Sequence, residues 1–159
     1  MHVFEASDIV KIAVRIEENG FAFYKFAEQI AKQEEAKKLF SHLASEEVNH
    51  KKIFEGIFAK MEKYSPQESY EGEYSSYLND YVDNNIIFTK DTLDKELAKI
   101  KDTVTALDFA IRRELDSILY YHEMKRFVPV AQQETLDQVI DEERKHFSKL
   151  SEAKKRFSA

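Results

Sequence analysis

The sequence predicts an all-α protein folded as a ferritin-like four-helix bundle, and three observations support this. Its 159 residues contain only three Gly and two Pro, so long helices can run without interruption. Apolar residues recur every three or four positions over four long stretches, which is the period of a helix buried along one face. Hydrophobic residues make up 43% of the chain, enough to form the core of a single domain.

The first half of the chain predicts two antiparallel helices. Ser7 or Asp8 can cap a first helix that runs to about Gln33. The polar link at about residues 32–35 is short. The next helix, at about residues 35–63, is therefore expected to run antiparallel to the first. The inward face of the first helix is predicted to contain Val10, Ala13, Glu17, Gly20, Tyr24 and Ala27. That of the second is predicted to contain Leu43, Glu47, His50, Phe54, Ile57 and Met61.

The second half predicts another such pair after a long connection at about residues 64–102. Ser65 and Pro66 end the second helix, and residues 91–100 are typical of a short helix within the connection. Since a 25-residue helix is about 37 Å long, we expect the connection to cross over along the side of the bundle. A third helix is predicted at residues 103–128, before Pro129, and a fourth at residues 130–156. Their inward faces are predicted to contain Leu107, Ile111, Glu114, Ile118, Tyr121 and Val128, and Leu136, Val139, Glu143, His146 and Leu150.

Each predicted apolar face is interrupted by a carboxylate, and the interruptions repeat between the two halves. Glu17 corresponds to Glu114, and the Glu-x-x-His step at Glu47 corresponds to the one at Glu143, at an offset of 96 or 97 residues. A tyrosine, Tyr24 or Tyr121, follows the first Glu of each half by seven residues. Taken alone, each Glu would be expected at the surface, but four in register favour one internal site.

Four carboxylates inside a bundle need compensating charge, because burying an unpaired carboxylate costs several kcal/mol or more. Two divalent cations would supply it. Oxygen ligands with one imidazole per ion suit iron or manganese, with zinc possible. The predicted terminal ligands are Glu17 and Glu114, the bridging ligands are Glu47 and Glu143, and the nitrogen ligands are His50 and His146. Tyr24 and Tyr121 could donate hydrogen bonds to ligand carboxylates, or could be plain core aromatics.

Composition excludes several other classes of protein. The chain has no Cys, which rules out disulfides, thiolate metal sites and a cysteine nucleophile. The absence of a signal-like apolar run or an 18-residue apolar stretch predicts a cytoplasmic protein with no membrane span. A net charge of −6 with interspersed basic residues disfavours nucleic-acid binding. His42 and His122 are predicted at the surface; Arg15 and Arg112 are predicted at the surface or as ion-pair partners near the site.

The motifs Glu17…Tyr24, EEVNH at residues 46–50, Glu114…Tyr121 and EERKH at residues 142–146 resemble those of a rubrerythrin-related member of the ferritin-like di-iron carboxylate superfamily. The resemblance implies one ferritin-like domain over residues 1–159, two iron ions, peroxide or dioxygen as substrate, and a homodimer. Rubrerythrins carry a rubredoxin domain with four Cys. Because this chain has none, electrons are expected from a separate donor such as a rubredoxin.

The resemblance departs at Ser117, where rubrerythrins carry an extra carboxylate three residues after the third-helix Glu. The equivalent position on the first helix is Gly20. Three functions therefore stay open: an enzyme that reduces peroxide or dioxygen, a ferroxidase or iron-storage protein, and a helical scaffold whose site holds a structural metal or none.

Overall fold

The computed structural model describes residues 6–61 and 90–158, and this part of the chain is helical without any strand. The helices are α1 (Ala6–Ile30), α2 (Glu34–Ala59), α4 (Lys90–Leu97), α5 (Thr103–Met124) and α6 (Val130–Phe157), with a 3₁₀ turn, η2 (Lys125–Phe127), between the last two. The predicted all-α fold class is confirmed.

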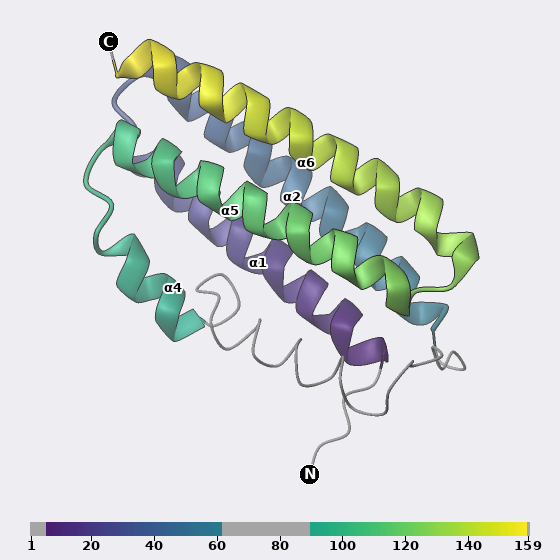
Figure 1. Cartoon of the computed structure of the whole chain (residues 1–159). Coiled ribbons are helices and arrows are strands. Elements are labelled where there is room, and N and C mark those ends of the chain that lie inside the picture. The colour runs from purple at the N-terminus through teal and green to yellow at the C-terminus, as the bar shows by residue number, and fades with distance from the viewer. Residues whose placement is uncertain (1–5, 62–89, 159) are drawn as a thin grey trace.

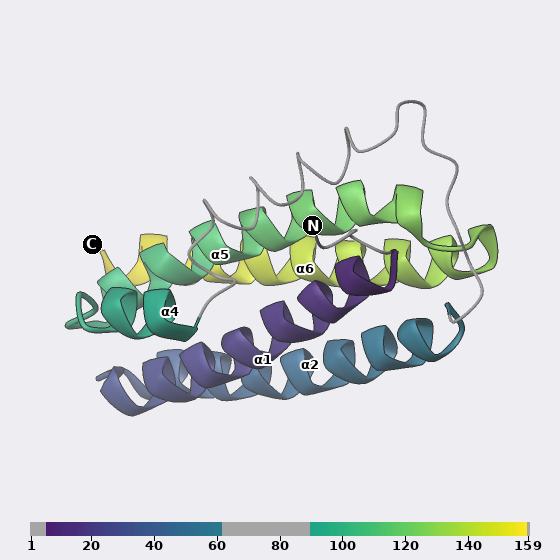
Figure 2. The ribbon, with the colours of Figure 1, turned by 90° about the horizontal axis from the view of Figure 1, so that it is seen from below.

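The four long helices form two antiparallel pairs that pack against each other (Figures 1 and 2). α1 packs chiefly against α2, and α5 against α6. The short link after α1 is fastened to the start of α5, since Thr103 Oγ1 accepts a hydrogen bond from Lys32 N (3.1 Å) and donates one to Gln33 Oε1 (2.7 Å). The predicted helical pairs are therefore present. The predicted helix stop at Ser65-Pro66 and most of the crossover lie outside the described residues, apart from α4, which contacts α1.

The helix ends differ from the predicted ones by a few residues. Ser7 and Asp8 lie inside the first turn of α1, so they do not act as its cap, and this helix ends at Ile30. α2 ends at Ala59, where the backbone N–H of Lys60 donates to carbonyls of the last turn.

The start of α5 is fixed by a capping box. Asp102 Oδ1 accepts the Thr105 N–H at 2.8 Å, and Thr105 Oγ1 accepts the Asp102 N–H at 3.2 Å. α5 itself ends at Met124 rather than continuing to Val128, because the chain tightens into a 3₁₀ turn before Pro129.

The core consists of two apolar clusters separated by polar side chains at the middle of the bundle. On every long helix the Glu or His of the repeat falls between members of the two clusters. One cluster includes Ile9, Ile16, Phe54, Tyr120, Met124 and Leu136. The other includes Phe23, Phe40, Leu43, Leu107, Ala110 and Leu150. The clusters close both ends of the central polar site against water.

The buried face of α5 is rotated from the predicted one. Ile111 and Ile118 are only partly buried, while Ala110, Arg113 and Ser117 are fully buried. These three belong to a regular series with three- and four-residue steps, and each isoleucine lies one residue further round the helix, at the edge of that face. The prediction for Ile111 and Ile118 was wrong because the most apolar residues of this helix do not define its most buried face.

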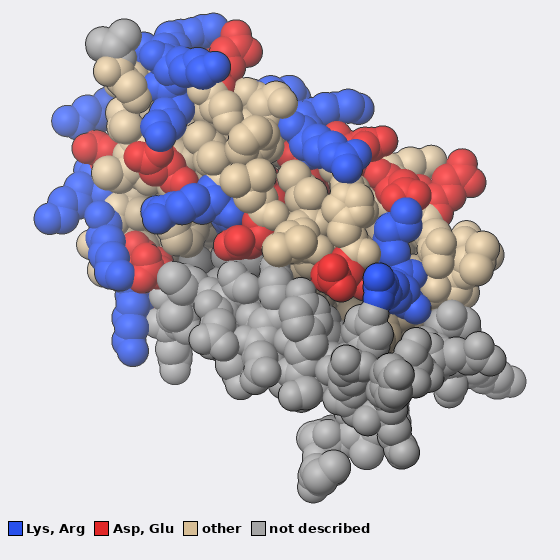
Figure 3. All heavy atoms as spheres, in the orientation of Figure 1, with Lys and Arg blue, Asp and Glu red and all other residues tan. Residues whose placement is uncertain are grey.

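On the face shown in Figure 3, the described residues carry basic and acidic side chains interspersed with one another. His42, His122, Arg15 and Arg112 are exposed, in agreement with a surface location. Among the described helices, none combines the length and the apolar character that crossing a membrane requires.

Candidate metal centre

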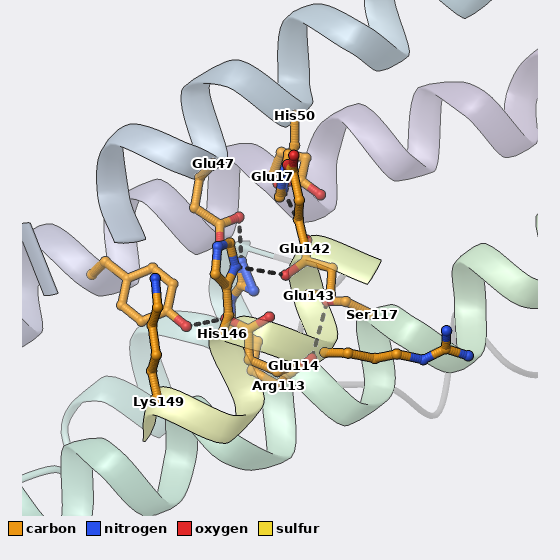
Figure 4. Close-up of polar contacts among 12 residues, drawn as sticks. Glu17, Glu47, His50, Arg113, Glu114, Ser117, Glu142, Glu143, His146 and Lys149 are labelled. Atoms are coloured by element: carbon orange, nitrogen blue, oxygen red, sulfur yellow. Dashed lines mark hydrogen bonds and ion pairs between the residues drawn. The ribbon is translucent and has the colours of Figure 1, made fainter. Parts of the chain in front are cut away.

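The six predicted ligands meet at the middle of the bundle, and all are buried (Figure 4). Each of the four long helices contributes one carboxylate, and α2 and α6 also contribute one imidazole each. The set is Glu17 from α1, Glu47 and His50 from α2, Glu114 from α5, and Glu143 and His146 from α6. The predicted convergence of these side chains is present in the fold; their role as ligands stays a prediction.

Five of the six residues fall into two groups of donor atoms that share one residue, and Glu47, which was predicted to bridge, belongs to neither group. Glu17, His50 and Glu143 form the first group, and Glu114, Glu143 and His146 form the second, with one atom from each residue within 4.8 Å of the others. A carboxylate common to two such groups can contact two adjacent cations, one through each oxygen. Glu143 therefore has the geometry that a bridging ligand needs.

Glu143 lies between the two histidines. Its Oε1 is 3.0 Å from His50 Nδ1, and its Oε2 is 3.1 Å from His146 Nδ1. Burial raises the pKa of the Glu143 carboxyl, but its contacts with Glu114, His146 and His50 outweigh burial and hold that pKa well below its usual value. Glu143 is thus an anion inside the bundle, which favours cation binding there.

His50 connects the interior of the site to the surface. Its Nδ1 faces inward, 3.6 Å from Glu17 Oε2, while its Nε2 lies 2.7 Å from Glu142 Oε2. A carboxylate on the outer nitrogen of a ligand histidine fixes the ring and its tautomer. The sequence predicted no role for Glu142 beyond its place in the motif at residues 142–146, so this contact was not predicted.

The two buried tyrosines connect α1 and α5 through hydrogen bonds. Tyr24 of α1 donates a hydrogen bond to Glu114 of α5, and Tyr121 of α5 donates one to Glu17 of α1. Burial, followed by the neighbouring carboxylates, raises the pKa of both phenols well above their usual value, so both remain protonated donors. Hydrogen bonding to the carboxylates is as expected, and each acceptor belongs to the opposite helix.

One charged residue at the site was not predicted. Arg113 is 2% exposed, and its Nη2 lies 2.6 Å from Glu47 Oε2. Its Cζ lies 5.4 Å from the centre of the Tyr24 ring. Gly20 of α1 makes room for it, since a Cβ there would be 1.5 Å from Arg113 Nη2. In the sequence Arg113 belongs to a charged run, and only this glycine on another helix signals that it is buried.

Ser117 supplies no additional ligand, because its hydroxyl donates to the backbone carbonyl of Arg113 at 3.0 Å. Ser117 belongs to neither of the two donor groups, although it is fully buried.

Comparison with known proteins agrees with this geometry. The sequence model of the rubrerythrin family matches residues 8–154. The chain belongs to the rubrerythrin family. A crystal structure from Thermotoga maritima, described as a "putative ferritin-like diiron-carboxylate protein", is similar to this rubrerythrin-family chain with 30% identity and a TM-score of 0.68, covering 98% of this chain and 97% of that one. A search of curated proteins found no match.

The family implies iron, and the buried donors of this rubrerythrin-family chain fit a metal. Glu17 Oε2, Glu47 Oε1 and Glu114 Oε2 are buried and accept no hydrogen bond from the described residues. Buried acceptors are normally paired, because an unpaired one costs about 1–3 kcal/mol. Divalent cations in the site would supply partners for such oxygens, and carboxylate oxygens with imidazole nitrogens are suitable ligands for iron.

Proposed function

We propose that this rubrerythrin-family protein is a di-iron oxidoreductase that reduces hydrogen peroxide or dioxygen with electrons from a separate donor such as a rubredoxin. The observation that carries the proposal is the sharing of Glu143 between two buried Glu/His groups. A bound, reduced iron pair supplies two electrons as each Fe(II) becomes Fe(III). One peroxide molecule, two electrons and two protons then give two molecules of water.

The side chains around the proposed iron pair have distinct roles. Glu143 would be held in common by the two ions, and Glu47 would offer them Oε1, which accepts no hydrogen bond from the described residues. The remaining proposed ligands are Glu17 and Glu114, as terminal carboxylates, and His50 and His146, as nitrogen donors.

The other buried groups orient these ligands and keep water out. Tyr24 and Tyr121 each hold one oxygen of a terminal carboxylate, leaving its second oxygen free. Glu142 fixes the ring of His50 from outside. The two apolar clusters on either side exclude bulk water, which strengthens electrostatic interactions within the site.

The test is peroxide turnover by protein loaded with Fe(II) under anaerobic conditions. The proposal predicts rapid oxidation of the iron by peroxide, followed by repeated turnover when reduced rubredoxin is supplied. Glu143→Ala should abolish turnover, and Glu152→Ala, an exposed change on the same helix, should not. Turnover by Glu143→Ala at the wild-type rate, or none by the wild type, would contradict the proposal.

A second candidate, a ferroxidase without sustained peroxide turnover, is favoured by the presence of Ser117. A serine stands where rubrerythrins carry an additional carboxylate, and its hydroxyl donates to the backbone. A ferroxidase would oxidise many Fe(II) ions per chain with dioxygen and would not consume peroxide repeatedly with a donor. Size-exclusion chromatography adds a second criterion, since a dimer is expected for the enzyme and a large cage for a storage protein.

A further inference from the structure

The internal repeat is broken at Arg113. The offset of 97 residues that relates Glu17 to Glu114 relates Ile16 to Arg113, and Gly20 to Ser117. One half of the site therefore contains a guanidinium where the other half has an apolar side chain. The four Glu and two His residues repeat between the two halves of the sequence, but the charged residue beside them, Arg113, does not.

Steric fit holds the guanidinium inside the bundle. Gly20 is buried, and a Cβ at this position would lie 1.5 Å from Arg113 Nη2 and 2.3 Å from Glu47 Oε2. The gap left by the glycine is therefore filled by the ion pair itself. Arg113 Nε and Nη1 are buried without a hydrogen-bond partner among the described residues, so Glu47 is the principal anchor of this cation.

The ion pair changes what Glu47 can offer to metal ions. Its Oε2 is taken by Arg113 at 2.6 Å, whereas Oε1 accepts no hydrogen bond from the described residues. Glu143, its counterpart in the repeat, has both oxygens directed at histidines of the two donor groups. One of the two central carboxylates is thus half occupied, and a fixed positive charge lies beside it.

We propose that Arg113 is a positioning residue that occupies one oxygen of Glu47 and makes the two metal positions unequal in affinity. This inference rests on the proposed metal centre. The first divalent ion binds where the negative charge is least compensated. The second ion then meets both the first ion and the guanidinium, and it binds more weakly because like charges repel.

The experiment is a titration of chelator-treated protein with Co(II) under anaerobic conditions, followed by calorimetry and by the visible absorption of bound cobalt. The wild type should show two unequal binding steps. Arg113→Met removes the charge but keeps an unbranched apolar side chain. The second ion should then bind about tenfold more tightly, because one unit of like charge no longer repels it. Arg113→Lys should retain unequal steps. Arg112→Met, an exposed change beside it, should behave as wild type.

Gly20→Ala gives an independent test from the facing helix. Its added Cβ cannot coexist with the observed guanidinium position, so the ion pair must be displaced. The second step should tighten as in Arg113→Met, and circular dichroism should show that the helices are retained. If Arg113→Met does not fold, Gly20→Ala still tests whether displacing the guanidinium tightens binding of the second ion. A variant that merely lost structure would bind both cobalt ions more weakly. Tighter binding of the second ion therefore distinguishes the proposed role of Arg113 from a purely structural one.

Two results overturn the inference in different ways. If the wild type binds two cobalt ions in equal steps, or if Arg113→Met and Gly20→Ala leave the second step unchanged or weaker, the inference fails and the proposed metal centre stands. If neither the wild type nor Arg113→Met binds cobalt, the metal centre itself fails.

Discussion

The stability of the metal-free protein should fall as the pH rises above neutral, and His50 is the main reason. Burial lowers the pKa of this imidazole, but its contacts with Glu143 and Glu17 outweigh burial and raise that pKa from 6.5 to about 12. A group whose pKa is higher in the folded state stabilises the fold fully below its unfolded pKa. That contribution is lost as the pH rises from 6.5 towards 12.

The size of the effect follows from proton linkage. Between pH 7 and pH 9 the unfolded imidazole is largely neutral while the folded one keeps its proton, so the free energy of unfolding should fall by about 1.4 kcal/mol per pH unit, or about 2.5 kcal/mol in all. Glu47 and Glu114 act in the same direction, because burial and the neighbouring carboxylates outweigh the opposing effect of Arg113 and raise the pKa of both carboxyls well above the usual value.

The assay is urea unfolding of chelator-treated protein, followed by circular dichroism at pH 7, 8 and 9. His50→Gln should have a flatter profile than the wild type, and His122→Gln, an exposed change, should keep the wild-type slope. Metal-loaded protein should not lose stability in this way, because ligands must lose their protons to bind a metal. A flat wild-type profile, or an equal slope in His50→Gln, would refute the reasoning.

Three further predictions concern individual contacts. Tyr24→Phe removes the hydrogen bond to Glu114 and should weaken metal binding about 10–100-fold in a competition titration with a chelator; unchanged affinity would show that the phenol is only core packing. Glu142→Gln removes the charge beside His50 and should weaken metal binding about tenfold in the same titration. Unchanged affinity would show that this contact does not orient the ring. Phe54→Ala empties a fully buried position and should lower the free energy of unfolding by about 3–5 kcal/mol in urea; a loss below about 1 kcal/mol would contradict the packing described.

The meeting of the candidate ligands at one place was predictable because it depends on helical periodicity and on the internal repeat. A Glu and a His three residues apart occupy one face of a helix, and the repeat places the same pair on a second helix. The sequence alone therefore predicted that Glu47, His50, Glu143 and His146 lie close together. The exact ends of α1 and α2 were less predictable, because alternative end points differ by only one or two terminal hydrogen bonds.

Arg113 could not be found in this way. Arginines in charged runs are usually exposed, and its burial depends on space provided by Gly20 on a helix far away in the sequence. The same holds for the rotation of α5, which buries Ala110 and Ser117 in preference to the larger Ile111. Both features depend on how closely helices approach each other, and apolar patterns do not record that distance.

The most direct test of the central claim is the iron content of the protein after anaerobic loading with Fe(II) and gel filtration, in the wild type and in Glu143→Ala. A centre built on one shared carboxylate should bind about two iron ions per chain and should lose them in the variant. Wild-type protein that retains no stoichiometric iron, or a variant that retains as much as the wild type, would contradict the account.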